Sequence, residues 1–147
     1  MTCIAWDGKT LAADKRATLS CQYRTTTKIF RLPDGSLIGV AGNATEGFDM
    51  VEWARNGFKP EDFPQNQRDK DMYADCLHVR VDGTAWMYQR SPAPMRVEDL
   101  QHAIGSGRDY ALMAMHLGKT AREAVELAGR FDHNCGNGID ELDLCPG

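Results

Sequence analysis

The sequence begins Met1-Thr2-Cys3-Ile4-Ala5-Trp6-Asp7-Gly8-Lys9-Thr10-Leu11-Ala12-Ala13-Asp14-Lys15-Arg16. Two β-prone runs, residues 2–6 and 10–14, flank Asp7-Gly8, the dipeptide that two-residue hairpin turns favour. The small pair Ala12-Ala13 suits a strand that is buried beneath other elements, and charged residues follow where that strand ends. The stretch therefore predicts a β-hairpin at the start of the chain, with the charged residues Asp14, Lys15 and Arg16 at the end of its second strand.

Thr2, in the same stretch, is also a candidate catalytic residue. A small residue directly after the initiator Met is what a methionine aminopeptidase accepts, so the mature chain is expected to begin at Thr2 with a free α-amine. Such an amine has a reference pKa of about 7.7–8.0, so near neutral pH it can take the proton of the threonine hydroxyl. One residue would then supply nucleophile and base. Many proteins begin Met-Thr without using it, so the dipeptide alone leaves both interpretations open.

Bulk properties exclude several functional classes. The 147 residues suit a single domain over residues 1–147, large enough to bury a core. A net charge of −4 with scattered Lys and Arg argues against nucleic acid as a partner. The sequence has neither an apolar run of about 18–20 residues nor a signal peptide, which predicts a cytoplasmic protein without a membrane partner.

The five cysteines are odd in number and irregularly spaced, which argues against a disulfide framework and for a reducing compartment. A zinc site drawn from His133, Cys135 and Cys145 matches no standard ligand spacing. Residues 132–143 resemble a calcium loop, but Asn137 stands where the invariant Gly belongs. A plain Gly-rich turn is therefore the favoured interpretation of that segment.

Hydrophobic periodicity and turn residues predict the other elements. The expected strands after the first hairpin are residues 28–32, 36–41, 76–81, 84–88 and, as the last short one, 103–104. The expected helices run from Asn43 or Thr45 to about Asn56, over 108–117, and from a capping box at Thr120 to about Gly129.

Two polar stretches interrupt this pattern. Residues 18–27 are rich in threonine, and residues 58–74 are interpreted as a surface connection with at most a helical turn. A second two-residue hairpin turn is expected at Asp82-Gly83. The order of elements predicts an α+β chain in which two antiparallel sheets are flanked by helices, a four-layer αββα sandwich.

Strand alternation places Thr26, Lys28 and Phe30 on one face of the third strand. Lys28 could there meet Asp14, which ends the second strand, and a buried lysine needs such a carboxylate partner. Several short motifs now become recognisable in order: Met1-Thr2, Ala12-Ala13-Asp14-Lys15-Arg16-Ala17-Thr18, Thr27-Lys28-Ile29, Val40-Ala41-Gly42, Gly105-Ser106-Gly107-Arg108-Asp109-Tyr110-Ala111-Leu112 and Asp132.

Together these motifs resemble the proteasome β-subunit family, most closely its bacterial HslV-type peptidases, over residues 2–56 and 76–145. The resemblance implies the fold of N-terminal-nucleophile hydrolases and a threonine-type endopeptidase that works inside an oligomeric chamber. The matching catalytic positions are Thr2, Asp14, Lys28, Gly42, Ser106 and Asp132.

The resemblance gives each catalytic position a role. Thr2 matches the nucleophile, with Asp14 and Lys28 as a buried ion pair beside it. The Lys28 ammonium would disfavour a second positive charge on the freed amine and would stabilise a developing alkoxide. The backbone N–H of Gly42 would meet the oxyanion, and Ser106 with Asp132 would lie near the amine. Cys135 stands where the family has a serine, and a thiol is a weaker donor.

The resemblance also implies how a substrate binds. A peptide would add as a strand along Ala17-Thr18 and residues 42–44, held mainly by main-chain hydrogen bonds. Apart from Thr18, the substrate positions wall the first specificity pocket, and their apolar character predicts cleavage after apolar or aromatic residues. The full substrate-binding set is Ala17, Thr18, Thr26, Phe30, Val40 and Ala44.

The implied partners are unfolded polypeptides or peptides, further copies of the chain in a homo-oligomeric ring, and an ATP-dependent unfoldase. No cofactor is required, although Gly129, Asp132 and Cys135 match positions whose backbone carbonyls hold a sodium ion in bacterial members. The polar residues 58–74 replace a helix that helps to join rings in the family. The alternative function is an inactive or unprocessed proteasome-fold subunit that serves assembly or binding.

Overall fold

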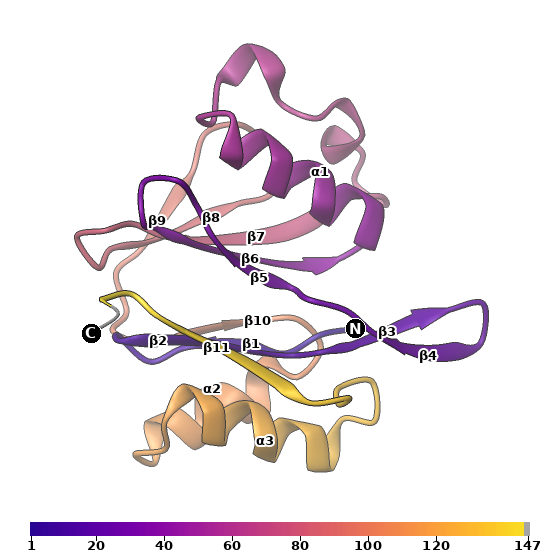
Figure 1. Ribbon diagram of the computed structural model, residues 1–147, viewed down its shortest axis with the longest axis vertical. Coiled ribbons are helices and arrows are strands. Elements are labelled where there is room, and N and C mark those ends of the chain that lie inside the picture. The colour runs from indigo at the N-terminus through magenta and orange to yellow at the C-terminus, as the bar shows by residue number, and fades with distance from the viewer. Residues whose placement is uncertain (146–147) are drawn as a thin grey trace.

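The computed structural model describes residues 1–145 as two stacked antiparallel sheets with helices on their outer faces (Figure 1). One sheet has the strand order β10-β1-β2-β11. Its strands are β1 Ile4–Trp6, β2 Thr10–Asp14, β10 His102–Ile104 and β11 Ile139–Asp143. The other sheet has the order β5-β6-β7-β8-β9. Its strands are β5 Ile29–Arg31, β6 Leu37–Gly42, β7 Ala74–Val79, β8 Ala85–Tyr88 and β9 Met95–Val97.

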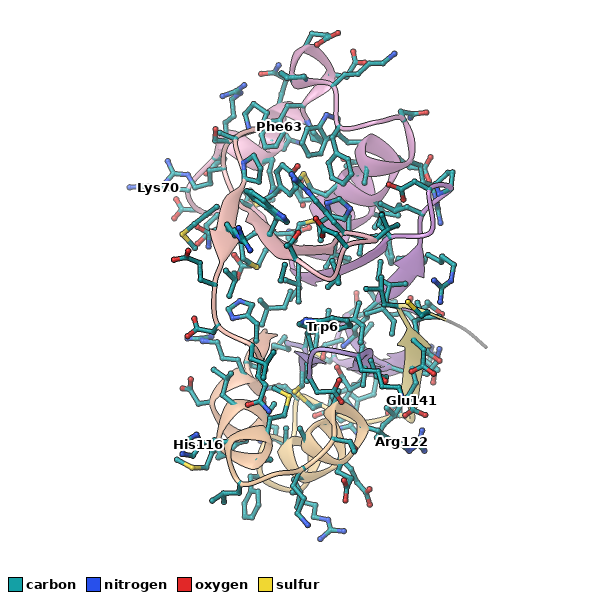
Figure 2. The ribbon with its side chains drawn as sticks, turned by 90° about the vertical axis from the view of Figure 1, so that its left-hand side faces the viewer. Trp6, Phe63, Lys70, His116, Arg122 and Glu141 are labelled. Atoms are coloured by element: carbon teal, nitrogen blue, oxygen red, sulfur yellow. The ribbon has the colours of Figure 1, made fainter. Side chains whose placement is uncertain are left out.

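Helices cover both outer faces, so the predicted αββα sandwich is confirmed. Helix α1 (Ala44–Arg55) lies over the β5–β9 sheet, whereas α2 (Arg108–His116) and α3 (Ala121–Phe131) lie under the other sheet (Figure 1). Between the sheets the core is built from large side chains such as Trp6, which Figure 2 labels. Beneath α2 and α3 the core is mostly alanine, so these helices approach their sheet closely.

The outer layer around α1 has an aromatic core. The ring of Trp53 makes edge contacts with Phe58, Phe63 and Tyr88 at centroid distances of 5.1, 5.0 and 5.2 Å. Phe63, labelled in Figure 2, belongs to the connection of residues 58–74, which contains only the 3₁₀ turns η1 (Pro60–Asp62) and η2 (Gln65–Arg68). The predicted surface connection with little helix is confirmed, but Phe63 and Gln67 anchor it in the interior.

Two local predictions about turns are wrong. Trp6 pairs with Leu11, so four residues separate the paired positions of the first hairpin. The Asp7 N–H bonds to Thr10 O at 3.3 Å and the Asp7 carboxylate accepts from the N–H groups of Lys9 and Thr10, so the chain turns at Gly8-Lys9 rather than at Asp7-Gly8. The second hairpin turns through residues 81–83, because the N–H of Gly83 bonds to Arg80 O and Gly83 takes a φ of +88°. The Asp-Gly pairs thus mark hairpins but do not form two-residue turns.

Four strands escaped the sequence analysis. The threonine-rich residues 18–27 contribute to an exposed ribbon of β3 (Arg16–Leu19) and β4 (Gln22–Thr25), which projects beyond the sheets (Figure 1). Strand β9 is short, and β11 follows α3, so residues 103–104 are not the last strand. None of the four alternates cleanly between apolar and polar residues. No helix within residues 1–145 is long and apolar enough to cross a membrane.

Candidate active site

Backbone hydrogen bonds hold Thr2 in the wall of a pocket. The N–H of Gly107 donates to the Thr2 carbonyl at 3.1 Å, and the N–H of Asp14 donates to the Cys3 carbonyl at 3.1 Å. Gly105 has a φ of +94°, and a Cβ on it would lie 2.0 Å from Thr2 O. Only glycine therefore lets the 105–107 turn close over Thr2, whose exposed fraction is 4%.

The Lys28 ammonium lies beside the Thr2 hydroxyl. Its Nζ is 3.1 Å from Thr2 Oγ1 and 2.8 Å from Asp14 Oδ1. Both partners of this ion pair are buried, with 7% of the lysine side chain and 2% of the aspartate side chain exposed. A third hydrogen bond, 3.3 Å long, runs from Lys28 Nζ to the carbonyl of Met1. An ammonium has three N–H donors, so all of them are engaged while Met1 is present.

Asp14 is fixed by its neighbours as well as by Lys28. Its Oδ1 also accepts from the Cys3 N–H at 2.9 Å, and its Oδ2 accepts from the N–H groups of Arg16 and Gly136 at 3.1 and 3.0 Å. A carboxylate whose two oxygens accept several hydrogen bonds is held in one orientation. The predicted meeting of Asp14 with Lys28 is therefore present in the structure.

A second polar chain approaches Thr2 from its nitrogen. The Thr2 N–H donates to Ser106 Oγ at 3.3 Å, and the Ser106 hydroxyl donates to Asp132 Oδ2 at 2.6 Å. Burial acts to raise the pKa of Asp132, but hydrogen bonds, foremost the one from Ser106, outweigh it and hold that pKa below its usual range. The Cys135 thiol donates to the same Oδ2 at 3.4 Å, and burial raises its pKa to about 12, so it stays protonated.

Gly42 presents its backbone N–H to the same space. Val40 N donates to Lys28 O, so alternation in an antiparallel ladder directs the N–H of Ala41 toward β7 and that of Gly42 back toward the β5 side. The chain has left the sheet on that side, because Thr26 N bonds to Lys15 O. Gly42 has a φ of +109°, and it lines the pocket that Thr2 and Lys28 line.

This pocket has a volume of about 350 Å³ and contains most of the predicted substrate positions. Ala17, Thr18, Thr26, Val40 and Ala44 line it, whereas Phe30 does not. The Phe30 ring lines an adjoining hollow behind Phe48, with its centroid 6.5 Å from that of Phe48. The structure adds Phe48 as a pocket residue. Helical spacing offered a signal for it, since Phe48 lies one turn after Ala44 on α1.

The predicted sodium positions lie at the C-terminal end of α3. A Cβ on Gly129 would lie 3.8 Å from the carbonyl oxygen of Cys135, so these two backbones are close. The last carbonyls of a helix lack intrahelical partners and carry partial negative charge, which suits a small cation. The Asp132 carbonyl already accepts the N–H of Cys135 at 3.0 Å. Within residues 1–145 no three His, Cys, Asp or Glu side chains gather at a metal-binding distance, which disfavours the zinc and calcium alternatives.

Comparisons with known proteins agree on the fold. No protein-family model matches the sequence, and no curated protein matches it. Among solved structures, BPH from Thiobacillus denitrificans in complex with epoxomicin is 19% identical, with a TM-score of 0.69 over 99% of this chain and 100% of that chain. Eukaryotic HslV from Trypanosoma brucei is 20% identical, with a TM-score of 0.71 over 97% of each chain.

The chain has the HslV fold. Within residues 1–145, its two stacked sheets and the three α-helices on their outer faces form the αββα architecture that the sequence motifs implied. At identities near one fifth, this likeness establishes the architecture, and the chemistry must be argued from the side chains around Thr2.

Proposed function

We propose that this chain is a threonine-type endopeptidase that uses the Thr2 hydroxyl as its nucleophile once Met1 has been removed. One observation carries the proposal: two chains of polar side chains converge on the single residue Thr2 beside a pocket, and one of them, the Lys28–Asp14 ion pair, is buried. Lys28 and Asp14 approach its hydroxyl, while Ser106 and Asp132 approach its nitrogen. Burying charged groups costs free energy of folding. Their gathering around one residue therefore indicates a functional site.

The reaction follows from these positions. The freed α-amine of Thr2 takes the hydroxyl proton, and Oγ1 attacks the carbonyl carbon of the scissile bond. The Lys28 ammonium stabilises the alkoxide and disfavours protonation of the amine, so it acts through charge rather than as the base. The amine then protonates the leaving group, and water, deprotonated by the same amine, releases the acyl group from Thr2.

The pocket supports the remaining roles. The Gly42 N–H, directed toward the pocket, would donate to the tetrahedral oxyanion, a contact worth about 3–4 kcal/mol in comparable acyl-transfer sites. A peptide would pair with Ala17-Thr18 of β3 and with residues 42–44, and its side chain before the cut would enter the hollow next to Val40 and Phe48. This lining supports a preference for apolar or aromatic residues.

Assembly and location are part of the same proposal. We expect a cytoplasmic homo-oligomeric ring that encloses the Thr2 sites, unfolded polypeptides as substrates, and an ATP-dependent unfoldase that delivers them. Backbone carbonyls of Gly129, Asp132 and Cys135 would hold a sodium ion that stiffens the turn after α3. The native mass of the purified protein, compared with the mass of one chain, tests the ring.

The alternative function, an inactive proteasome-fold subunit, follows if Met1 stays in place. With Met1 attached, the nitrogen of Thr2 is an amide that cannot act as a base, and the Met1 carbonyl occupies one Lys28 donor. The two functions therefore differ by one covalent bond. Intact mass of the protein from its native source distinguishes them directly.

The experiment combines that mass with activity on a panel of fluorogenic peptides. Wild type without Met1 should cleave after apolar residues, Thr2→Ala should be inactive, and Thr45→Ala, an exposed threonine on α1, should match wild type. Epoxomicin, with which BPH was crystallised, should block turnover in wild type. Retention of Met1 on an inactive native protein, activity that survives Thr2→Ala, or cleavage confined to charged residues would contradict the proposal.

A further inference from the structure

A single glutamine in the polar connection is completely buried. Gln67 belongs to η2, a short turn whose other residues are exposed, yet the exposed fraction of Gln67 is 0%. Burying a primary amide is unfavourable unless its donors and its acceptor all find partners. The position of Gln67 is therefore specified by whatever those partners are.

The partners are backbone groups at the start of β7 and the end of β8. Gln67 Oε1 accepts from the N–H of Ala74 at 3.0 Å, and Nε2 donates to the carbonyl of Ala74 and, at 2.6 Å, to that of Gln89. The side-chain amide thus offers Ala74 one acceptor and one donor, as a residue of a neighbouring strand would. Both the N–H and the C=O of Ala74 are therefore bonded to Gln67 and are not free to pair with another strand.

Ala74 is the residue that lies opposite Gly42 on β6. The two form a pair without mutual hydrogen bonds, since the N–H and C=O of Ala74 are turned toward Gln67 and the N–H of Gly42 is turned toward the pocket. Their backbones are in close contact, because a Cβ on Gly42 would lie 3.2 Å from Ala74 Cα and 3.2 Å from Tyr73 O. No hydrogen bond between the pair fixes Gly42, so packing against Ala74 does.

We infer that Gln67 is a positioning residue for the catalytic site: it fixes Ala74, and Ala74 fixes the direction of the Gly42 N–H. The inference rests on the proposed function, because it assigns Gly42 the oxyanion. The connection of residues 58–74 would then contribute to catalysis through the side-chain amide of Gln67. A displacement of the donor by a fraction of an ångström weakens a contact that matters most in the transition state.

The test replaces Gln67 by Met, which has a similar shape and no amide. Gln65→Met is the matched control, since Gln65 lies on the same turn and is exposed. We expect kcat of Gln67→Met to fall about tenfold with KM within about twofold of wild type, and Gln65→Met to match wild type. The affinity for a peptide aldehyde, whose adduct with Thr2 carries an oxyanion, should fall in parallel with kcat.

A second variant keeps the test decisive if Gln67→Met folds poorly. Gln67→Asn keeps the amide but shortens the side chain by one methylene, so it can no longer reach both Ala74 and Gln89, and we expect a smaller decrease in kcat and unchanged KM. An unchanged kcat in every folded Gln67 variant, or a loss that appears only in KM or only in Tm, would overturn the positioning role. Failure of the proposed function looks different: wild type itself would then show no turnover that depends on Thr2.

Discussion

At the scale of single residues, the chain of hydrogen bonds that reaches the Thr2 nitrogen begins at a thiol. Cys135 donates to Asp132, which accepts from Ser106, which contacts the Thr2 nitrogen. Cys135→Ala should lower kcat/KM about two- to fivefold, because a net hydrogen bond contributes about 0.5–1 kcal/mol. Cys135→Ser should equal or exceed wild type, because a hydroxyl is the stronger donor. Equal kcat/KM for wild type and Cys135→Ala across pH 6–9 would show that this contact contributes nothing.

Gly105 offers a sharper residue-scale prediction, because the chain contains its control. Gly105 and Gly118 both have a φ of +94°, but a Cβ on Gly105 would collide with the Thr2 carbonyl, whereas Gly118 has nothing within 4 Å. Gly118→Ala should cost about 1–2 kcal/mol of unfolding free energy, through backbone strain alone. Gly105→Ala should cost about 3 kcal/mol or more and abolish activity. Denaturant unfolding of both variants measures the difference, and equal losses would contradict the collision.

At this scale the sequence predicted the polar residues of the candidate site better than the residues that wall its pocket. Thr2 was predicted from its place directly after Met1, and Asp14 with Lys28 because a buried lysine needs a carboxylate partner; the structure brings all three within hydrogen-bond distance. The position of Phe30 outside the pocket has a physical cause: alternation along β5 gives its face, but only the packing of α1 shows that Phe48 lines the pocket and that Phe30 lines the neighbouring hollow with it. Contacts between elements that are distant in sequence cannot be read from periodicity.

At the scale of elements, α1 connects the site to the outer layer, and it begins at Ala44, two residues after Gly42. Of the two caps that the sequence allowed, the Asn43 side chain accepts from the N–H groups of Thr45 and Glu46. Asn43→Ala should therefore destabilise the protein by about 1 kcal/mol, whereas Thr45→Ala should change stability by less than about 0.5 kcal/mol. Thermal unfolding of the two variants tests this assignment, and the reverse ranking would make Thr45 the cap.

The sequence predicted best the elements whose signals lie within their own residues. A capping box at Thr120 marks the start of α3, and both of its hydrogen bonds are present. Strand β11 was missed because its residues Ile139–Asp143 are mostly acidic and only partly buried, so their pairing with β2 supplies the order that their composition does not. The β3–β4 ribbon is likewise held by its own ladder rather than by a buried face.

At the scale of the whole molecule, the layers follow from burial patterns that the sequence displays. Alternating strands around Gly-containing turns predict two antiparallel sheets, and helical periodicity in three places predicts the covering layers. The closing of the sandwich around a polar site was not visible in this way. It depends on buried side chains such as Gln67, which lies in a segment whose other residues indicate a surface connection.

His78 gives the folded molecule a predictable dependence on pH. It lies on β7, is 5% exposed, bonds through Nε2 to Ser36 Oγ at 3.0 Å, and packs with its ring centroid 4.6 Å from that of Phe58. Burial, assisted by the nearby Arg80 and opposed by Asp34, lowers the pKa of His78 to about 4 from its ordinary 6.5. The folded state therefore holds this imidazole neutral.

The sign of the effect follows from proton binding. Between about pH 6.5 and pH 4 the unfolded chain binds a proton at His78 that the folded chain does not, so the free energy of unfolding falls as pH falls through this window. The contribution is complete above about pH 6.5 and reaches at most about 3.5 kcal/mol, at about 1.4 kcal/mol per pKa unit. His78→Gln, which keeps a donor for Ser36, should flatten the decrease in Tm between pH 7 and pH 4.5. His116→Gln, at an exposed histidine on α2, should leave the wild-type slope. Parallel slopes for His78→Gln and wild type would mean that His78 is protonated without unfolding, and that the layer between β7 and Phe58 opens more readily than its packing indicates.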